Sequence, residues 1–370
     1  MSKSKIQEAS EKEVKTFKNL KEDIIDPGLC CACGACVSYC ENQKFEVIEM
    51  KDYTPRFKSE KSEENCTECG LCYFICAQTN PIMEKIEEFY DAKSEIGHIE
   101  NILAAKTTDT KIEEIGQDGG VVSTLLTYLF DKNKIDGAVV SQYNEKLEPV
   151  PTLIFNKEEL LKAAGTRYSI SSQLLPLKEI YNLPLEIIEE KGIYDVNSMR
   201  LAFVGTPCQL RAIRKMHFLS VTPVHTIKYV ISLFCFENFN YNNLYDTLKK
   251  ETNVSPENIT KTYIKKNFFV ESKDNEKYEV DIKKLDSAVR SHCHECDEFT
   301  GKYSDISVGS SGAPKGYSMI IVRTDKGKEI IKSMIEHKYI EQLIIPADET
   351  KEWKEKKIKL FKRMINLKHK

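Results

Sequence analysis

The stretch CCACGACVSYC (residues 30–40) is followed by a second stretch, CTECGLCYFIC (residues 66–76), with the same arrangement of cysteines. Both follow the spacing C-x2-C-x2-C-x3-C. Three thiolates this close together can wrap around one metal cluster, and the fourth, on the following helix, can reach a second cluster. The doubled motif therefore predicts a small N-terminal module built around metal.

This spacing is the ligand pattern of a bacterial ferredoxin that holds two [4Fe-4S] clusters. In such a module the fourth cysteine of each motif ligates the other cluster, which gives pseudo-twofold symmetry. Two ligand sets are therefore expected. They are Cys30, Cys33, Cys36 and Cys76 for the first cluster, and Cys66, Cys69, Cys72 and Cys40 for the second.

The module departs from the usual pattern in two places. Glu41 and Ala77 stand where a proline usually follows each fourth cysteine, and 25 residues separate Cys40 from Cys66. The shape of the connecting hairpin therefore stays open. Paired C-x2-C groups also build zinc sites, but those sites lack the doubled spacing. Cys31 lies outside the pattern, and we expect it to be a spectator.

The charge balance narrows the class of protein. The 370 residues include 54 Lys+Arg and 57 Asp+Glu, for a formal net charge of -3. Nucleic-acid binders usually carry a basic surplus, so nucleic acid is not an expected partner. No apolar run approaches the ~20 residues of a membrane-spanning helix, and the polar start resembles no signal or transit peptide. We expect a cytoplasmic protein, whose cysteines a reducing environment keeps available for metal.

The chain divides into five segments by composition. We expect an α/β (α+β) domain preceded by a two-cluster ferredoxin-like domain, because short β-branched runs alternate with helical stretches after residue 102. The segments are a charged extension (1–27), the cysteine module (28–82), a connector (83–101), the large domain (102–348) and a basic tail (349–370).

Strands and helices of the large domain are indicated by local pattern. Strands are predicted at residues 137–143, 151–155, 201–205, 229–236 and 318–324, and helices at 119–134 and 209–216.

The remaining four cysteines are Cys208, Cys235, Cys293 and Cys296. A single cysteine at a strand end is usually a small buried apolar side chain. The ends of strands in one α/β sheet, however, converge on the same crevice, where a C-x2-C loop can complete a four-thiolate site. With His292 and His294 nearby, spacing alone leaves zinc and an iron-sulfur cluster both open.

Two glycine-containing segments are candidates for binding a nucleotide cofactor. The first opens a helix, where backbone N–H groups can face a pyrophosphate, and the second offers close backbone approach, a hydroxyl, a charge and an aromatic ring. Taken alone, each is also compatible with an ordinary turn or loop. The candidates are Gln117, Asp118, Gly119, Gly120, Val121 and Ser123 in the first segment and Gly165, Thr166, Arg167 and Tyr168 in the second.

Six motifs resemble, in order, the β subunit of coenzyme F420-reducing hydrogenase and its relatives. The resemblance covers roughly residues 102–345. The motifs are IGQDGGVVSTLL (115–126), LKAAGTRYS (161–169), VGTPCQLRAIRKM (204–216), SLFCFENF (232–239), CHECDEF (293–299) and DISVGSSGAPKGYSMIIVRTDKG (305–327).

The resemblance implies a third [4Fe-4S] cluster, held by Cys208, Cys235, Cys293 and Cys296, beside an FAD over which coenzyme F420 binds. Thr206 in the GTPC motif joins the candidate cofactor contacts. With the N-terminal module, the architecture is similar to the electron-input subunit of F420H2 dehydrogenase and to F420-linked subunits of formate dehydrogenase, heterodisulfide reductase and sulfite reductase systems. The hydrogenase β subunit lacks this module.

The activity implied by the resemblance is hydride transfer between F420 and FAD, with single electrons relayed through the clusters, as in archaeal methanogenesis. No side chain is expected to act as an acid or base, so no catalytic residue is assigned. The anionic tail of F420 favours basic groups at the pocket mouth, with Lys315, Arg167 and Arg323 as candidates. Electrons would pass to or from ferredoxin, a quinone- or methanophenazine-linked dehydrogenase, heterodisulfide reductase, formate dehydrogenase or hydrogenase subunits.

Two alternatives remain at this level. The same flavin and clusters could serve a ferredoxin-linked reductase that acts on a substrate other than F420, because fold alone does not fix the substrate. A non-catalytic ferredoxin-like relay without FAD is the other alternative. The basic tail from Lys351 is read either as a solvated helix or as a docking element for a partner or an acidic membrane surface.

Overall fold

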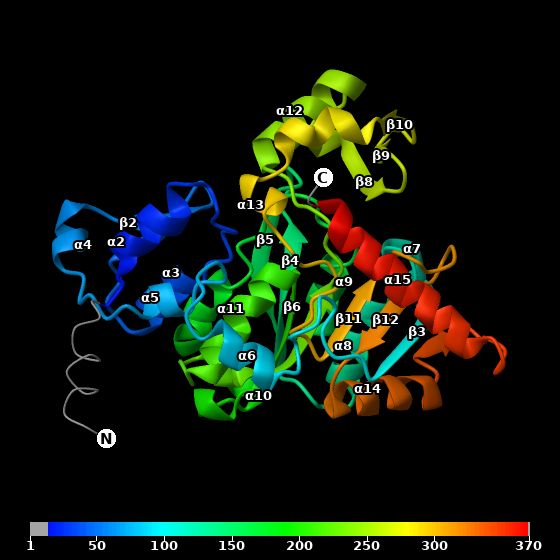
Figure 1. The fold of residues 1–370 in the computed structure, drawn as a ribbon, viewed down its shortest axis with the longest axis horizontal. Coiled ribbons are helices and arrows are strands. Elements are labelled where there is room, and N and C mark those ends of the chain that lie inside the picture. The colour runs from blue at the N-terminus through cyan, green and yellow to red at the C-terminus, as the bar shows by residue number, and fades with distance from the viewer. Residues whose placement is uncertain (1–13, 369–370) are drawn as a thin grey trace.

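The computed structural model describes residues 14–368. A mixed eight-stranded sheet forms the centre, with the cysteine module on one side and a small three-stranded sheet above one end (Figure 1). This confirms the expected α/β fold. The large sheet has the order β13-β3-β12-β11-β7-β6-β4-β5. Its strands are β3 (Asn101–Thr107), β4 (Gly137–Tyr143), β5 (Pro149–Ile154), β6 (Leu201–Gly205), β7 (Ile227–Leu233), β11 (Ile306–Gly309), β12 (Ser318–Val322) and β13 (Ile340–Gln342).

The middle of the sheet is parallel. Strand β4 pairs with β6, β6 with β7, and β7 with β11, all in the same direction. The flanking strands β5, β12, β3 and β13 pair antiparallel. The four parallel strands therefore end at one edge of the sheet, where a ligand crevice is expected.

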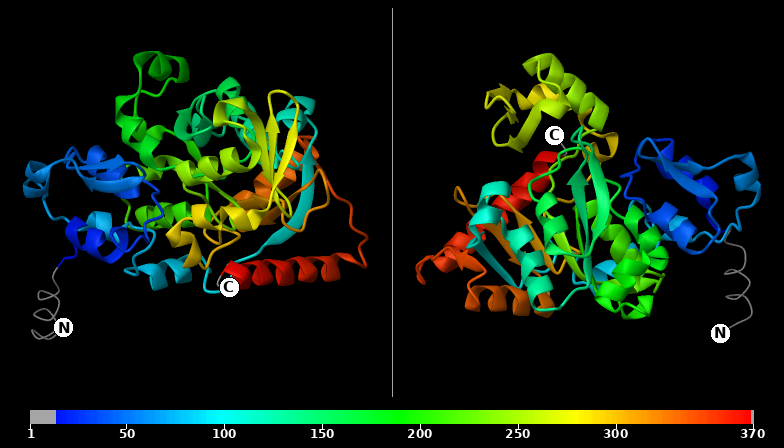
Figure 2. Two further views of the ribbon diagram at one scale, coloured as in Figure 1. Left: turned by 90° about the horizontal axis from the view of Figure 1, so that it is seen from above. Right: turned by 180° about the vertical axis from the view of Figure 1, so that it is seen from behind.

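Helices cover both faces of the sheet, and side chains alternate between the two faces with the strand period of two. In β4, Ala138 and Val140 share a core with α8 and α14, whereas Val139 belongs to the opposite core with α11 and η2. A second core on the face of Val139 packs α15 against β3 and β12. Figure 2 shows α15, in red, running along the outside of the large domain.

The helical elements of the large domain and of the connector are short except for α8, α11, α12, α14 and α15. They are α6 (Met83–Phe89), α7 (Thr110–Ile115), α8 (Val121–Asp131), α9 (Lys157–Lys162), η2 (Leu175–Asn182), α10 (Leu185–Lys191), η3 (Val196–Ser198), α11 (Pro207–Phe218), η4 (Val224–Thr226), α12 (Tyr241–Thr252), η5 (Pro256–Asn258), η6 (Ile282–Ala288), α13 (Ser291–His294), α14 (Asp325–Glu336) and α15 (Thr350–Lys368).

The small sheet is an excursion between β7 and β11. It has the order β10-β9-β8, with both pairs antiparallel. Together with α12 and η6 it has a core of its own, which includes Phe239, Leu248 and Phe268. Its strands are β8 (Ile259–Ile264), β9 (Phe268–Ser272) and β10 (Lys277–Val280).

The cysteine module repeats one local geometry. A glycine follows the second cysteine of each motif, and both glycines, Gly34 and Gly70, have a positive φ and begin a helix. A side chain at Gly34 would also meet Leu175, with its Cβ 2.9 Å from Leu175 Cγ. Glycine is therefore required there both for the turn and for the contact with η2. The elements are α2 (Phe17–Leu20), η1 (Lys21–Ile25), α3 (Ala35–Asn42), β1 (Ile48–Lys51), β2 (Thr54–Phe57), α4 (Glu60–Glu64) and α5 (Leu71–Phe74).

Part of the N-terminal extension belongs to this module. The sequence indicated only a charged extension over residues 1–27. Instead, Phe17, Leu20 and Ile24 are buried in one core with Cys36, Cys40 and Cys72. Residues 1–13 lie outside the described part of the chain.

Helix α11 joins the module to the sheet. Ile75 of the module is fully buried in one core with Leu210 and Met216 of α11. Lys215, also fully buried, donates from Nζ to the carbonyl of Cys76 at 2.7 Å and to the carbonyl and hydroxyl of Thr79. Burial lowers the pKa of Lys215 to about 8. The module is thus packed onto the large domain by shared apolar and polar contacts.

The basic C-terminal segment packs on its own chain. Phe361 and Ile365 of α15 are 0% and 5% exposed, and Lys357 donates to the carbonyl of Gly312 at 2.7 Å. The sequence left this tail open as a solvated helix or as a docking element for a partner or a membrane; in the structure its apolar side packs on the large domain. Within residues 14–368, no helix is long and apolar enough to cross a membrane.

Several of the predicted strands and helices agree with the structure to within a few residues. Other elements of the structure were not predicted. Strands β4 and β6 begin and end where predicted, and α8 and α11 lie within two or three residues of their predicted ends. Strand β7 begins and ends earlier than predicted. The sequence patterns did not indicate β3, the small sheet, β11, β13, α12 or α14.

His217, near the end of α11, gives a pH-dependent test of this packing. Its Nε2 lies 3.0 Å from the carbonyl of Val224 and 3.2 Å from that of Ile227, so the neutral ring donates there. Burial lowers the pKa of His217 from 6.5 to about 4. Below pH 6.5 the unfolded chain therefore takes up a proton that the folded chain does not, and stability falls as the pH falls toward 4.

We expect this histidine to remove about 2 kcal/mol of stability between pH 6.5 and pH 5. Anaerobic urea unfolding followed by far-UV circular dichroism, compared with H217Q, measures the difference. Glutamine keeps an N–H donor but does not titrate, so the variant should lose less stability over this range. Parallel curves for the two proteins would contradict the assignment.

Candidate functional site

A cavity of about 730 Å³ opens at the carboxyl edge of the parallel strands. Its floor is formed by the ends of β4, β6, β7 and β11, and its sides by the start of α8, the loop after α9, the β8–β9 turn and α13. This size is in the range of small-molecule and cofactor pockets. The crevice expected from parallel strand direction is therefore present.

The third cysteine set lines this cavity. Cys208 lies in the first turn of α11, Cys235 follows β7, Cys293 is in α13 and Cys296 follows it. Burial raises the pKa of the Cys235 thiol well above its ordinary value, and the neighbouring thiols add to this shift. The backbone N–H of Asn238 donates to Cys293 Sγ at 3.3 Å. Four converging thiols with such a donor fit the donor set of an iron-sulfur cluster.

Local sequence explains how Cys208 reaches the cavity. Thr206 caps α11 in a capping box with Gln209, and Pro207 occupies the first helical position. These residues start the helix directly after β6. The thiol of Cys208 therefore projects from the beginning of the helix into the crevice.

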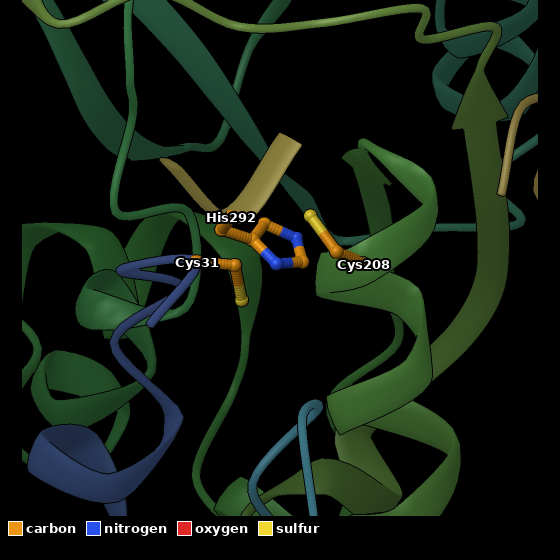
Figure 3. Close-up of side chains that lie close together, drawn as sticks. All are labelled: Cys31, Cys208 and His292. Atoms are coloured by element: carbon orange, nitrogen blue, oxygen red, sulfur yellow. The ribbon is translucent and has the colours of Figure 1, made fainter. Parts of the chain in front are cut away.

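Cys31 is close to this set, which the sequence did not indicate. The Sγ atoms of Cys31 and Cys208 and a ring nitrogen of His292 lie within 4.8 Å of one another. Figure 3 shows the three side chains meeting from the N-terminal loop, α11 and α13. The pKa of Cys208 is raised well above its ordinary value, mainly by the contact with the Cys31 thiol and secondly by burial. Cys31 was expected to be a spectator outside the motif, and the structure places its thiol beside the third cysteine set. The trio is also a possible zinc-binding group.

The two N-terminal ligand sets come together as crossed sets. Cys30, Cys33, Cys36 and Cys76 line one small hollow beneath α2 and η1. Burial raises the pKa of Cys76 to about 11, with Cys30 as a neighbouring thiol. Burial also raises the pKa of Cys40, and there the neighbouring thiols are Cys66 and Cys69. The fourth cysteine of each motif thus lies beside the first three of the other motif.

The first set lies against the cavity wall. Arg290, the residue before α13, donates to the carbonyl of Cys30 at 2.7 Å and to that of Cys31 at 3.0 Å. Cys31, Arg290 and His292 all line the cavity. The loop that carries the first ligand set is therefore in contact with the third ligand set.

Most of the predicted cofactor contacts line the cavity. Those that do are Gln117, Asp118, Gly120, Val121, Ser123, Gly165, Thr166, Arg167, Tyr168 and Thr206. Gly119 is not among the lining residues; a Cβ there would come within 2.5 Å of the backbone nitrogen of Ser318 and 2.6 Å of the carbonyl oxygen of Ala105. That glycine allows α8 to start close to the sheet, because any side chain would collide with backbone.

Unpartnered polar atoms in the wall are consistent with a polar cofactor. Ser141 Oγ, Ser169 Oγ and Asn238 Oδ1 are buried, line the cavity and have no hydrogen-bond partner within residues 14–368. Such groups normally find a partner, since leaving one unpaired costs about 1 to 3 kcal/mol. The residues therefore fit a bound group that offers donors and acceptors, as a flavin dinucleotide does.

The basic residues chosen from the sequence are arranged differently from the prediction. Arg323 is 4% exposed and donates to Ser307 Oγ and to the carbonyls of Ile96 and His98, so its assignment to the pocket mouth is wrong. Arg167 donates to carbonyls at the end of α9 and lies over the ring of Tyr143, 4.5 Å from its centroid. Lys315 is exposed and is not among the lining residues.

Other basic residues reach the cavity and were missed. Lys265 and Lys266 lie in the β8–β9 turn, and Lys368 is the last residue of α15. Burial raises the pKa of Asp118, while Lys261 and Lys265 act in the opposite direction. The consecutive lysines in YIKKNFF were the one available signal, but without the hairpin their orientation could not be deduced.

Comparison with known proteins agrees with this arrangement. Residues 102–178 match the family description for the N-terminal part of the coenzyme F420 hydrogenase/dehydrogenase beta subunit, and residues 198–346 match the description for its C-terminal part. One of the subunits of F(420)H(2) dehydrogenase from Methanosarcina mazei is 32% identical over 314 residues, which cover 83% of this chain and 82% of that protein.

Two further similarities extend the comparison. The coenzyme F420-dependent sulfite reductase of Methanocaldococcus jannaschii is 32% identical over 364 residues, covering 93% of this chain but only 51% of that protein, so the chain spans about half its length. A chain of the F420-reducing [NiFe] hydrogenase complex from Methanosarcina barkeri superposes with a TM-score of 0.64 at 29% identity, covering 75% of this chain and 92% of that one. All three named relatives are oxidoreductases or parts of oxidoreductase complexes. The chain belongs to the coenzyme F420 hydrogenase/dehydrogenase beta subunit family.

Proposed function

We propose that this protein is an F420-dependent oxidoreductase that transfers hydride between coenzyme F420 and FAD and exchanges single electrons with a partner through three [4Fe-4S] clusters. The observation that carries the proposal is the shared cavity, into which both glycine-containing segments and the four thiols of the third set open. Family membership supports F420 as the substrate.

The bound flavin would supply the conversion between two-electron and one-electron transfer, which no side chain can perform. The chain's own residues hold and orient the cofactors. The segments around Gly120 and Gly165 would approach the flavin nucleotide with their backbone, and Ser141, Ser169 and Asn238 would satisfy its polar groups. The small sheet, through Lys265 and Lys266, would face the anionic tail of F420.

The partner and the cellular setting belong to the proposal as well. Ferredoxin, a quinone- or methanophenazine-linked dehydrogenase, heterodisulfide reductase, formate dehydrogenase or hydrogenase subunits would exchange electrons with the N-terminal clusters. We propose a cytoplasmic protein of an archaeal methanogen that reaches a membrane only through such a complex.

The first test is anaerobic reduction of the reconstituted chain. Reduced F420 should bleach the flavin and then the cluster absorbance, whereas NADH should not. Flavin content should be near one FAD per chain. Bleaching by NADH alone, or none by reduced F420, would contradict the substrate assignment and favour a ferredoxin-linked reductase; absence of stoichiometric flavin would favour the electron relay.

The second test counts metal at the third site. The intact chain should hold about twelve irons in three clusters. C208S should lose about four, because it removes one of the four ligands of one cluster, whereas C31S should retain all of them. Metal analysis that finds about eight irons and one zinc in the intact chain would instead assign the site to zinc.

The third test concerns the anionic tail of F420. Charge reversal in K266E should raise the KM for F420 several-fold with little change in flavin content, since the residue lines the cavity. K273E is a matched control, because Lys273 is exposed in the same small sheet region but does not line the cavity. An equal KM in the two variants would remove Lys266 from the site.

A further inference from the structure

The last residue of α15 lies against the third cysteine set. Lys368 Nζ donates to Cys296 Sγ at 3.4 Å, to the carbonyl of Cys235 at 3.2 Å and to the carbonyl of Glu298 at 2.5 Å. Two of these three acceptors belong to proposed ligands of the third cluster. The side chain also lines the cavity.

The contact joins segments that are far apart in the chain. Lys368 is 133 residues from Cys235 and 72 from Cys296. Its position depends on α15, which is held by the buried side chains Phe361 and Ile365. Since a packed helix presents the ammonium group, the charge is fixed beside the thiols rather than carried on a free tail.

This donor differs in kind from other donors to cysteine sulfur in the described chain. Cys30, Cys76 and Cys293 accept from neutral backbone N–H groups, and the Cys208 sulfur lies 3.3 Å from the neutral hydroxyl of Thr206. Cys296 accepts from a charged ammonium group. A charge-assisted hydrogen bond is roughly twice as strong as a neutral one.

Two other cations of this region have partners elsewhere: Arg290 donates to the carbonyls of Cys30 and Cys31, and Arg211 is paired with carboxylates. Arg211 Nη2 lies 3.0 Å from Asp297 Oδ1 and 3.7 Å from Glu298 Oε1. Its charge is therefore largely offset by these two carboxylates. Lys368, by contrast, makes its polar contacts with a thiol sulfur and two carbonyls, so its positive charge acts on the cysteine set.

We propose that Lys368 is a positioning residue that raises the reduction potential of the third cluster. Reduction adds negative charge to an iron-sulfur cluster, so a nearby cation and an N–H donor to a ligand sulfur favour the reduced form. The cluster beside the cavity thereby becomes the readier acceptor of electrons from the flavin. The inference rests on the third cluster of the proposed function.

The test is a mediator-controlled redox titration of the full chain, reconstituted anaerobically with iron and sulfide and followed by electron paramagnetic resonance. In K368M, one of the three reducible clusters should shift to a more negative potential. A tenfold lower ratio of reduced to oxidised cluster at fixed ambient potential is expected, equivalent to about 59 mV for a one-electron couple.

Two variants control for charge and for helix structure. K368R keeps the positive charge and should restore the intact titration curve. K362M removes an exposed lysine from the same helix and should leave the curve unchanged. A shift in K362M equal to that in K368M would overturn the proposal, since the effect would then be one of general charge or helix stability.

The remaining outcomes are decisive as well. Coincident curves for K368M and the intact chain, at equal iron content, would overturn the inference and leave the proposed function untouched. Loss of about four irons in K368M would also overturn it, because the lysine would then be needed to hold the cluster. Failure of the intact chain to assemble a third cluster, with C208S equal in iron content, would overturn both.

Discussion

The parallel pairing of β4, β6, β7 and β11 is the constraint on which the site depends. Parallel strands all end at the same edge of a sheet, so whatever follows each strand is brought to one crevice. Cys208 follows β6 and Cys235 follows β7, and their meeting is therefore a result of strand direction. The loop from α13 then needs to supply only a short C-x2-C segment to complete the set.

Electrostatics shape the same region from several sides. Thiols packed together in a low-dielectric interior resist ionisation, as the raised pKa values of Cys235 and Cys208 show. Two cations, the buried Lys215 beside Cys76 and the partly buried Lys368 beside Cys296, offset negative charge at two of the three cysteine sets. Since burying a lysine is costly without compensation, both positions fit a chain that carries anionic centres.

A structural feature could be predicted from the sequence when it depends on residues that are close together in the chain. The crossed cysteine sets and the strands β4 and β6 follow from spacing and residue type within a few positions, and these were predictable. Arg323 was misjudged because a basic residue type does not reveal whether its side chain points into the core, into a cavity or into solvent. Lys266 and Lys368 reach the cavity through a hairpin and a long helix, and no local pattern encodes those paths. Cys31 was missed for a related reason, since its neighbour Cys208 is distant in sequence.

Helix α11 has a consequence for how such proteins can be assembled from parts during evolution. Its first turn carries Cys208, and two turns later its apolar side and Lys215 are covered by Ile75 and by the carbonyls of Cys76 and Thr79. A chain that lost the N-terminal module would expose this surface, and a chain that gained a module by gene fusion would need a matching one. The N-terminal module and the large domain therefore cannot be exchanged between proteins as independent domains. Their inheritance is coupled through the sequence of one helix.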